Sequence, residues 1–553
     1  YGASPTFVLA SATAGDPAGS ASRLTGLPVV AVADDASPRG STQFALWEPP
    51  LTDHGGENDA PTRRTATAET AMLLTDLVVE GVCTLAFVRS RRGAEAVAMT
   101  ARDSLAEVEP DLATRVAAYR AGYLPEERRE LEAQLRDGRL LGVAATNALE
   151  LGVDVTGLDA VLLCGWPGTR ASLWQQAGRA GRSGDDALAI LVARDDPLDT
   201  YLVHHPSSIF GTPVEATVCD PTNPYVLGPH LCAAAAELPL TEDELDRFGP
   251  TTAEVLAALV ERGLLRRRPG GWFWTRPERA SDLADLRGIG GGMVRVVEDG
   301  TGRMLGTVDP GAAHTTVHTG AVYVHQGATY LVDHLDLADA VAVAHREDVD
   351  YTTSARDTTD IRIVGEIARE AWGDAELVHG HVEVTNQVVA YLKRRYLTGT
   401  VLGEEPLSLP PRHLRTQAVW WTVTASQLAA ASLADVDVPG AAHAAEHASI
   451  GLLPLVATCD RWDIGGVSTA LHPDTDRMTV FVYDGHPGGA GFAERGFTAA
   501  HTWLTATREA IASCECPDGC PSCVQSPKCG NGNDPLDKAG AVRLLDVLLA
   551  GAP

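Results

Sequence analysis

Apolar and polar residues alternate with two different periods along residues 65–200. Short apolar runs predict buried strands, whereas apolar residues spaced three or four positions apart predict helices with one buried face. By this pattern the predicted strands are 84–89, 140–145, 160–164 and 187–192, and the predicted helices are 68–80, 93–106 and 126–136. Strands that alternate with helices indicate a parallel sheet with helices on both faces. Upstream, Thr25–Asp34 is predicted to form a further strand.

The pattern changes in the second half of the chain. Residues 224–276 contain two helical stretches, a basic strand, a Pro-Gly-Gly turn and an aromatic strand, an order that resembles a winged helix. Residues 290–350 are rich in Val, Gly, Thr and His, and they predict a small antiparallel β-barrel or sheet. Residues 376–553 mix strands with a small-residue helix at 441–457.

Two arginines end the segment Ala144–Arg182. Arg179 and Arg182 lie three positions apart among small residues, so a short helix would point both guanidinium groups to one side. Such a pair suits the charge that develops on a transferring phosphoryl group. An arginine-rich solvated helix is the alternative. The preceding loop after an apolar run, Thr146–Asp154, favours the phosphate interpretation.

The same segment resembles motifs V and VI of superfamily 2 helicases, in the second RecA-like lobe. Ser11-Ala12-Thr13 resembles motif III, and Leu85–Ser90 resembles motif IV. The resemblance implies that Arg179 and Arg182 contact ATP phosphates and that Gln175 positions nucleotide or water. It implies coupling of nucleotide state to lobe movement by Gly152, Asp154, Ser11 and Thr13. It implies contacts with the DNA backbone from Thr146, Asn147 and Arg89.

The lysines argue against a complete ATP site. A phosphate-binding P-loop needs Gly-Lys-Ser/Thr, but the three lysines follow Leu392, Pro527 and Asp537. A D-E-x-H magnesium motif is also missing, and the chain opens in the middle of a domain without methionine. We therefore expect a C-terminal fragment that does not hydrolyse ATP alone. ATP and Mg²⁺ would bind the full-length protein.

Charge and the basic strand bear on DNA binding. A formal net charge of −29 opposes simple polyanion binding, although an arginine-lined channel in an acidic surface is compatible with it. In the winged-helix segment, phosphate contacts are predicted for Arg266, Arg267 and Arg268, and base stacking for Trp272. The alternative is an internal packing module. The expected partner is single-stranded or tailed duplex DNA.

Five cysteines cluster near the C-terminal end, at 514, 516, 520, 523 and 529. Tight turns at the intervening Pro and Gly residues aim several thiolates at one point, which predicts a structural Zn²⁺ site. The predicted ligands are Cys514, Cys516, Cys520 and Cys523, with Cys529 as an alternative ligand. An iron–sulfur cluster is a lesser alternative.

The helix at 441–457 carries the sequence H-x-x-E-H. His443 and His447 lie one turn apart with Glu446 between them, as in inverted zinc peptidases. Such an enzyme needs a further carboxylate ligand, for which Asp460, Asp463 and Asp484 are candidates. Close helix packing with hydrogen-bonded histidines is the preferred interpretation.

The tail as a whole supports a second resemblance. Glu446–Ala448, Cys459–Gly466, Tyr483–Gly491 and the cysteine cluster resemble the C-terminal domain of MrfA-type DNA repair helicases, a family that includes the SftH helicases. The resemblance implies a zinc-binding accessory domain in a DNA translocase that moves 3′ to 5′. A nucleic-acid-binding module without motor activity is the rival function.

Together these observations predict a multidomain α/β protein. The expected units are the end of the first RecA-like lobe (1–20), the second RecA-like lobe (21–205), a winged helix (206–285), a β-rich module (286–370) and an α+β zinc-binding domain (371–553). Because no apolar run approaches the ~20 residues of a membrane span, a membrane is not an expected partner. We expect a monomer in the bacterial cytoplasm, associated with the nucleoid.

Overall fold

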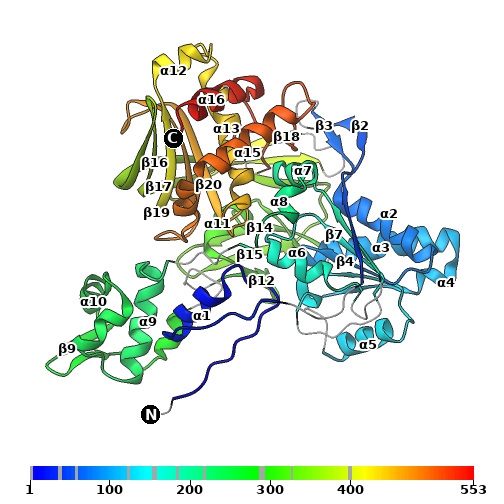
Figure 1. The fold of residues 1–553 in the computed structure, drawn as a ribbon, viewed down its shortest axis with the longest axis horizontal. Helices are drawn as coiled ribbons and strands as arrows, with labels where there is room; N and C mark the ends of the chain where they lie inside the picture. Colours follow the sequence, from blue (N-terminus) through cyan, green and yellow to red (C-terminus); the bar gives the residue numbers. More distant parts are fainter. Residues whose placement is uncertain are drawn as a thin grey trace.

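The computed structural model describes residues 4–34, 40–56, 60–120, 125–151, 158–181, 186–215, 220–284, 293–325, 328–395, 401–527 and 529–553. These residues form four successive units: a parallel sheet with helices, a helical unit with a two-stranded ribbon, a five-stranded sheet, and a C-terminal unit around a six-stranded sheet (Figure 1). No helix in these ranges is both long and apolar enough to cross a membrane.

The first unit is built on a parallel sheet with strand order β1-β8-β7-β4-β6-β5. Its strands are β1 (Thr42–Trp47), β4 (Thr84–Val88), β5 (Val116–Tyr119), β6 (Gly142–Ala145), β7 (Ala160–Cys164) and β8 (Ala187–Val192). A smaller ribbon pairs β2 (Leu51–Gly55) with β3 (Pro61–Arg63). The helices are α2 (Ala66–Val79), α3 (Arg91–Val108), α4 (Pro110–Ala113), α5 (Pro125–Arg136), α6 (Arg170–Ala177), α7 (Pro197–His204) and α8 (Ser207–Phe210).

Buried strands that face helices on both sides explain the apolar runs of this sheet. In β4, Leu85 and Phe87 join the core on one face, while Ala86 and Val88 join the core under α2 and α3 on the other. The predicted strands and helices between 65 and 200 are confirmed. The two strands that the pattern missed, β1 and β5, are the edges of the sheet.

The strand predicted at Thr25–Asp34 is wrong. Helix α1 (Pro17–Thr25) occupies its start, and residues 28–34 form no strand. Gly26 ends this helix with φ of 70°, in the left-handed region that glycine adopts without strain. Val30 and Val32, 87% and 93% exposed, meet no neighbouring strand, so their apolar character does not build a sheet.

The second unit confirms the predicted winged helix. It contains α9 (Pro224–Glu237), the 3₁₀ helix η3 (Glu242–Phe248), α10 (Thr252–Glu261), the ribbon strands β9 (Leu265–Arg268) and β10 (Gly271–Trp274), and η4 (Ala280–Leu283). Its own small core includes Leu231, Leu256 and Trp272. This unit lies apart from the parallel sheet, at the lower left of Figure 1.

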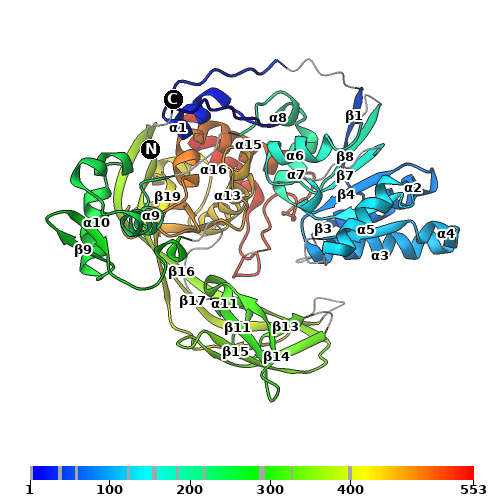
Figure 2. The ribbon, with the colours of Figure 1, turned by 90° about the horizontal axis from the view of Figure 1, so that it is seen from below.

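The third unit is a five-stranded sheet with order β12-β11-β15-β14-β13. The strands are β11 (Val294–Glu298), β12 (Met304–Val308), β13 (Val322–His325), β14 (Ala328–Asp336) and β15 (Val341–Arg346), with α11 (Pro310–Thr316) between β12 and β13. The β-rich prediction is confirmed, but the sheet is mixed, because β11 pairs with β15 in parallel. Figure 2 shows the unit at the end of the long strands β16 and β17.

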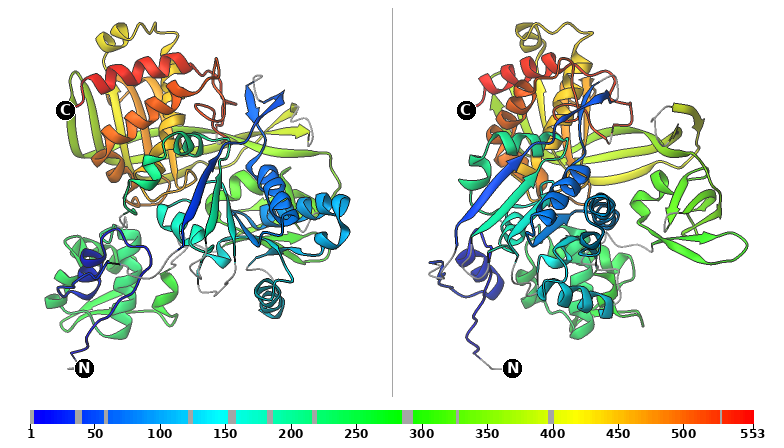
Figure 3. Two further views of the ribbon diagram at one scale, coloured as in Figure 1. Left: turned by 45° about the vertical axis from the view of Figure 1, so that its right-hand side comes forward. Right: turned by 90° about the vertical axis from the view of Figure 1, so that its right-hand side faces the viewer.

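The fourth unit has an antiparallel sheet with order β16-β17-β19-β21-β20, and β18 pairs with β17. The strands are β16 (Tyr351–Trp372), β17 (Ala375–Arg395), β18 (Val401–Pro406), β19 (Arg412–Val423), β20 (Ile464–His472) and β21 (Arg477–Asp484). The helices are α12 (Ala425–Ala430), α13 (Val438–Leu452), α14 (Phe492–Thr498), α15 (Ala500–Ser513) and α16 (Lys538–Ala550), several of which cover one face of the sheet (Figure 3).

This sheet begins earlier than the boundary expected at residue 371. Strand β16 starts at Tyr351 and pairs with β17 over its whole length. Its sequence is rich in Thr, Asp and Arg, and most of its positions are exposed or half-buried. A strand without a regular apolar face gives no signal of period two, so the sequence pattern did not reveal it.

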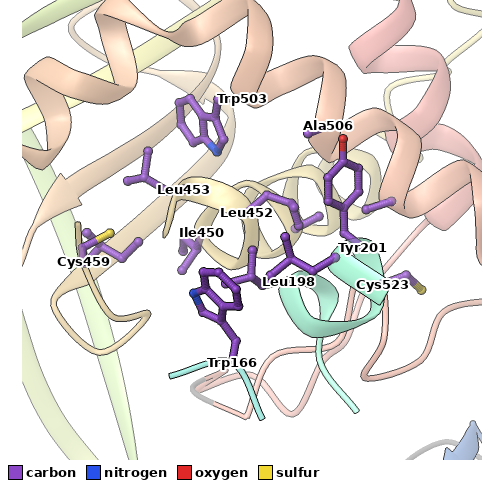
Figure 4. Close-up of a cluster of buried hydrophobic side chains, with 14 of the residues drawn as sticks. Trp166, Leu198, Tyr201, Ile450, Leu452, Leu453, Cys459, Trp503, Ala506 and Cys523 are labelled. Atoms are coloured by element: carbon purple, nitrogen blue, oxygen red, sulfur yellow. The ribbon is translucent and has the colours of Figure 1, made fainter. Parts of the chain in front are cut away.

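One apolar core joins the first and fourth units. Trp166, Leu198 and Tyr201 from the first unit pack with Leu452 and Trp503 of the fourth (Figure 4). Helix α7 contacts both α13 and α15. Because burial of such side chains contributes about 1.5–3 kcal/mol each, the lobe and the C-terminal unit form a single stable body.

Candidate functional site

Helix α6 carries Gln175 and ends before Arg179, which lies in the turn after the helix and not on it. Glu150 fixes this region. The Glu150 carboxylate is 8% exposed and accepts hydrogen bonds from the Ser172 hydroxyl and the Gln176 side-chain amide, both at 2.8 Å. The buried guanidinium of Arg179 donates to the Glu150 carbonyl. The structure therefore ties the end of α6 to the loop after β6. No motif or spacing in the sequence singles out Glu150.

Gln175 faces the N-terminal segment. Its side-chain amide donates to the Thr13 hydroxyl at 2.6 Å. The Ser11 hydroxyl donates to the Thr13 carbonyl at 3.2 Å and shapes the same turn. Three predicted residues, Ser11, Thr13 and Gln175, are thus brought together although their sequence positions are far apart.

Five other predicted residues fall into two groups: three lie outside the described ranges, and two follow the end of strand β6. Gly152, Asp154 and Arg182 lie outside the described residues. Thr146 and Asn147 lie directly after β6, at the carboxyl edge where ligands of parallel sheets bind. Thr146 is buried and Asn147 is exposed.

Arg89 lies at the junction of two units. Its guanidinium forms an ion pair with the carboxylate of Asp460 in the fourth unit. Burial lowers the pKa of Arg89, and the neighbouring Arg194 lowers it further. Arg194 in turn approaches Gly165, whose φ of 83° and lack of a side chain leave room for that guanidinium. The pairing makes Arg89 a contact between units, a role that sequence reasoning did not identify.

The basic strand β9 presents exposed arginines beside a buried tryptophan. Arg266, Arg267 and Arg268 are exposed. Trp272 is only 7% exposed, and the Arg267 guanidinium lies 5.0 Å from its ring centroid and pairs with Glu242. The predicted base stacking by Trp272 is therefore wrong, because the ring belongs to the core of the winged helix. In a domain with so small a core, the Trp272 ring is needed to fill that core.

Four thiols converge after α15 as predicted. The Sγ–Sγ distances that join neighbouring pairs among Cys514, Cys516, Cys520 and Cys523 are 3.5 to 3.8 Å. A tetrahedron with zinc–sulfur bonds of ~2.3 Å has edges of about 3.8 Å, so the four thiols fit a zinc ion. The Cys520 N–H donates to the Cys523 sulfur at 3.3 Å, a contact that favours a thiolate there.

Lys538 supports this cluster from α16. Its ammonium donates to the Cys514 carbonyl at 2.6 Å and to the Cys516 sulfur at 3.4 Å. Four thiolates around Zn²⁺ carry a net charge of −2, and one nearby cation offsets part of it. Among the three lysines of the chain, this one has a role that the sequence pattern did not predict.

Cys529 is not part of the four-thiol group, so the alternative in which it replaces one of those ligands is not supported. It groups instead with His443 and His447, whose ligand atoms lie within 4.8 Å of one another and of its sulfur.

The peptidase interpretation of H-x-x-E-H does not fit the structure. Glu446 is 7% exposed and lies against Gly466 of β20, and burial raises its pKa. A buried carboxyl group that faces a sheet cannot activate water for hydrolysis. The Asp484 carboxylate is already engaged by four backbone N–H groups of residues 490–493, and Asp460 pairs with Arg89.

Side chains also link the cysteine loop and the winged helix to their neighbours. The Ser522 hydroxyl donates to the Asp195 carboxylate, which also accepts from the Arg63 N–H at 3.0 Å. At the start of α9, the Asn223 amide donates to the carbonyls of Pro487 and Gly489 at 2.9 and 2.7 Å. The C-terminal unit therefore holds both the lobe and the winged helix by specific hydrogen bonds.

Three family models match successive parts of the chain. The helicase conserved C-terminal domain matches residues 69–184. The winged helix domain of the ATP-dependent helicase HRQ1 matches residues 219–289, and the MrfA Zn-binding domain matches residues 445–524. These matches coincide with the parallel-sheet unit, the winged helix and the region from α13 to the four-thiol cluster.

Whole-chain relatives agree with these matches. The chain is 34% identical over 95% of its length to the uncharacterized ATP-dependent helicase YprA of Bacillus subtilis, and it covers 69% of that protein. It is 30% identical to the ATP-dependent helicase hrq1 of Schizosaccharomyces pombe but spans only 52% of it. The crystal structure of the DUF1998 helicase MrfA bound to DNA matches 99% of the chain with a TM-score of 0.64 and 32% identity, and 72% of that structure is covered. The chain therefore belongs to the MrfA-type family of superfamily 2 helicases.

Proposed function

We propose that this chain supplies the second motor lobe and the accessory domains of an ATP-dependent DNA helicase that moves 3′ to 5′ and acts in DNA repair. The observation that carries the proposal is the hydrogen bond between Gln175 and Thr13, because it places the motif VI helix against the motif III segment. In a helicase of this superfamily these two motifs meet at the cleft between the lobes. The proposed domain divisions are those expected from the sequence, except that the C-terminal domain begins at the start of β16.

In this proposal the nucleotide is held between this lobe and an upstream lobe with a P-loop. Arg179 and Arg182 contact the phosphates, and Gln175 positions the nucleotide or its attacking water. Gly152, Asp154, Ser11 and Thr13 couple nucleotide state to lobe movement. Binding of Mg²⁺ and hydrolysis of ATP require the complete site, which both lobes form together.

DNA would run from the carboxyl edge of the parallel sheet toward the winged helix. At the carboxyl edge of the sheet, Thr146 and Asn147 hold the backbone of the DNA strand. At the winged helix, Arg266 and Arg268 contact its phosphates. Support comes from the exposure of Asn147 and the β9 arginines, and from relatives whose crystal structures hold DNA, or DNA with AMPPNP. We place the protein in the bacterial cytoplasm as a monomer on nucleoid DNA.

The zinc ion has a structural role in this proposal. It fixes residues 514–523, whose Ser522 contacts Asp195 of the lobe. Free energy of metal binding then contributes directly to the folding of the C-terminal unit.

ATP turnover with and without single-stranded DNA tests the motor function. The chain alone should show no turnover, and the chain joined to an upstream lobe with a P-loop should show turnover that DNA stimulates. Arg179→Ala in the joined protein should lower kcat by ~10³-fold, the order of magnitude for loss of an arginine finger. DNA binding without DNA-stimulated turnover by the joined protein would instead indicate a binding module without motor activity. ATP turnover by the chain alone would contradict the proposal that the chain carries only part of the ATP site.

A further inference from the structure

A second group of metal-ligating side chains lies beside the four-thiol cluster. His443 and His447 are one helical turn apart on α13, and Cys529 follows the cysteine cluster in the chain. The Cys529 sulfur lies 3.6 Å from the His443 Nε2 atom, and one ligand atom of each of the three residues lies within 4.8 Å of the others. His447 is buried, and the other two side chains are half-buried.

Backbone carbonyls fix the tautomer of both histidines. The Nδ1 atom of His443 lies 2.9 Å from the Pro535 carbonyl, and that of His447 lies 2.9 Å from the Val524 carbonyl. Because a carbonyl oxygen only accepts hydrogen bonds, each neutral ring carries its proton on Nδ1 and leaves the Nε2 lone pair free. Histidines that bind metals are held in this way, with the second ring nitrogen donating to a carbonyl or carboxylate.

A simple hydrogen bond does not account for the whole arrangement. The Cys529 thiol has one proton, but a ring nitrogen of each histidine lies within 4.8 Å of its sulfur. The Nδ1 atoms are engaged by carbonyls, which leaves Nε2 as the acceptor of each ring. The backbone N–H of Asn533 also donates to that sulfur, at 3.3 Å. An N–H donor aimed at sulfur is compatible with a thiolate, and a thiolate has no proton to give to either histidine. A cation at the centre would satisfy the sulfur and both nitrogens at once.

The distances fit zinc. With Zn–N bonds of ~2.0–2.1 Å and a Zn–S bond of ~2.3 Å, tetrahedral geometry places a nitrogen and a sulfur ligand about 3.6 Å apart. The observed distance between the His443 Nε2 and Cys529 Sγ atoms is 3.6 Å. Two imidazoles and one thiolate are borderline-soft ligands, which suit Zn²⁺ and not Mg²⁺ or Ca²⁺.

We propose that His443, His447 and Cys529 form a second Zn²⁺ site, separate from the four-cysteine site, with water at the fourth position. Glu446 is buried against Gly466 of β20 and is not free to activate a water molecule, so this site is not a peptidase centre. The ion would fasten the segment after the cysteine cluster to α13. Hydrogen bonds already hold that segment there, including the one from the Asp537 N–H to the Gly440 carbonyl at 3.0 Å. This inference does not depend on the proposed motor function.

Native mass spectrometry of the whole chain counts the ions. The protein is loaded with Zn²⁺ and dialysed against metal-free buffer before measurement. Wild type should retain two zinc ions per chain, Cys529→Ser and His443→Gln should each retain one, and Cys83→Ser, a thiol in the parallel-sheet unit, should retain two. One ion in wild type, or two in Cys529→Ser, would overturn the proposal.

Zinc X-ray absorption of the wild-type protein gives a readout that needs no variant to fold. With both sites filled, the average zinc should have about 2.5 sulfur neighbours and a clear imidazole signal, since one ion has four sulfur ligands and the other has one. A spectrum with four sulfur neighbours and no imidazole would overturn the proposal even if two ions were counted.

Discussion

The side-chain amide of Gln175 donates a 2.6 Å hydrogen bond to the hydroxyl oxygen of Thr13, which lies 162 residues earlier in the chain. The bond joins the end of helix α6 to a segment that precedes the whole parallel sheet. Glu150 holds the same helix through hydrogen bonds with Ser172 and Gln176. Helix α6, which carries Gln175 and is followed by Arg179, is therefore positioned by two other segments of the chain.

Gln175→Leu should release the N-terminal segment from α6. The substitution keeps the approximate volume of the side chain but removes the donor, and a bond between neutral groups contributes about 1 kcal/mol. Local opening should then become ~5-fold more frequent. Hydrogen exchange of the amides between residues 7 and 25 measures this opening.

Thr13→Val should give the same increase, and the double variant should add little to either single one, because both remove one bond. Ser11→Ala is the matched control for the amides beyond this turn, since, among the described residues, the Ser11 hydroxyl bonds only with the Thr13 backbone and not with α6. Equal exchange in wild type and Gln175→Leu would mean that the bond does not hold the segment.

Lys538→Met should weaken the four-cysteine zinc site without changing a ligand. The ammonium contacts the carbonyls of Cys514 and Cys516 as well as the Cys516 sulfur. Loss of such supporting contacts lowers metal affinity by ~10- to 100-fold. Competition with a zinc-binding dye measures the affinity. Lys393→Met, which removes a lysine of β17 that pairs with Glu405, should leave the affinity unchanged. Equal affinities in both variants would contradict a role for Lys538.

The sequence was sufficient wherever the pattern is local. The strand Ala160–Cys164 alternates between two buried faces and was predicted with its observed bounds. The four zinc-site cysteines lie within ten residues, so their turns alone bring the sulfur atoms together. Both predictions depend only on neighbours in the chain, and local sequence patterns report such neighbours directly.

Contacts between distant segments escaped the sequence. Spacing along the chain groups Cys529 with the other cysteines, whereas the fold places it with His443, more than eighty residues earlier. A short aromatic strand does not reveal the exposure of its rings, so the sequence predicts stacking by Trp272, whereas the core of the winged helix buries this ring. Glu150 belongs to no recognisable sequence pattern, and its role becomes visible only in its hydrogen bonds with Ser172 and Gln176 of α6. Long-range packing decides each of these cases.

Arg266→Ala combined with Arg268→Ala should weaken binding to single-stranded or tailed duplex DNA. Both side chains are exposed on β9, whereas Arg267 between them pairs with Glu242. If each arginine contacts one phosphate of a single strand, the slope of log affinity against log salt should fall by about 0.7 per arginine removed. Fluorescence anisotropy at several salt concentrations measures the slope. The control is Arg262→Ala, an exposed arginine of the same unit at the end of α10. An unchanged slope in the double variant would place the DNA elsewhere.

The five-stranded sheet should be more stable at low pH because of His345. The Nδ1 atom of this histidine lies 2.8 Å from an Asp333 carboxylate oxygen, and its Nε2 atom lies 2.9 Å from Glu347. A neutral imidazole has one N–H and can donate to only one of them, so the two carboxylates raise the pKa of His345, with Asp333 as the larger cause. A raised pKa in the folded state gives stabilisation that is complete below the unfolded value of about 6.5 and is lost as pH rises through the folded value. Since the ring is partly exposed, the effect should be about 0.5 kcal/mol.

Urea unfolding at about pH 5.5 and about pH 9 measures this effect. His345→Gln should be less stable than wild type at the lower pH and equal to it at the higher pH. His325→Gln, on β13 of the same sheet, should show no such difference, and a wild-type advantage that grows with pH would contradict the assignment.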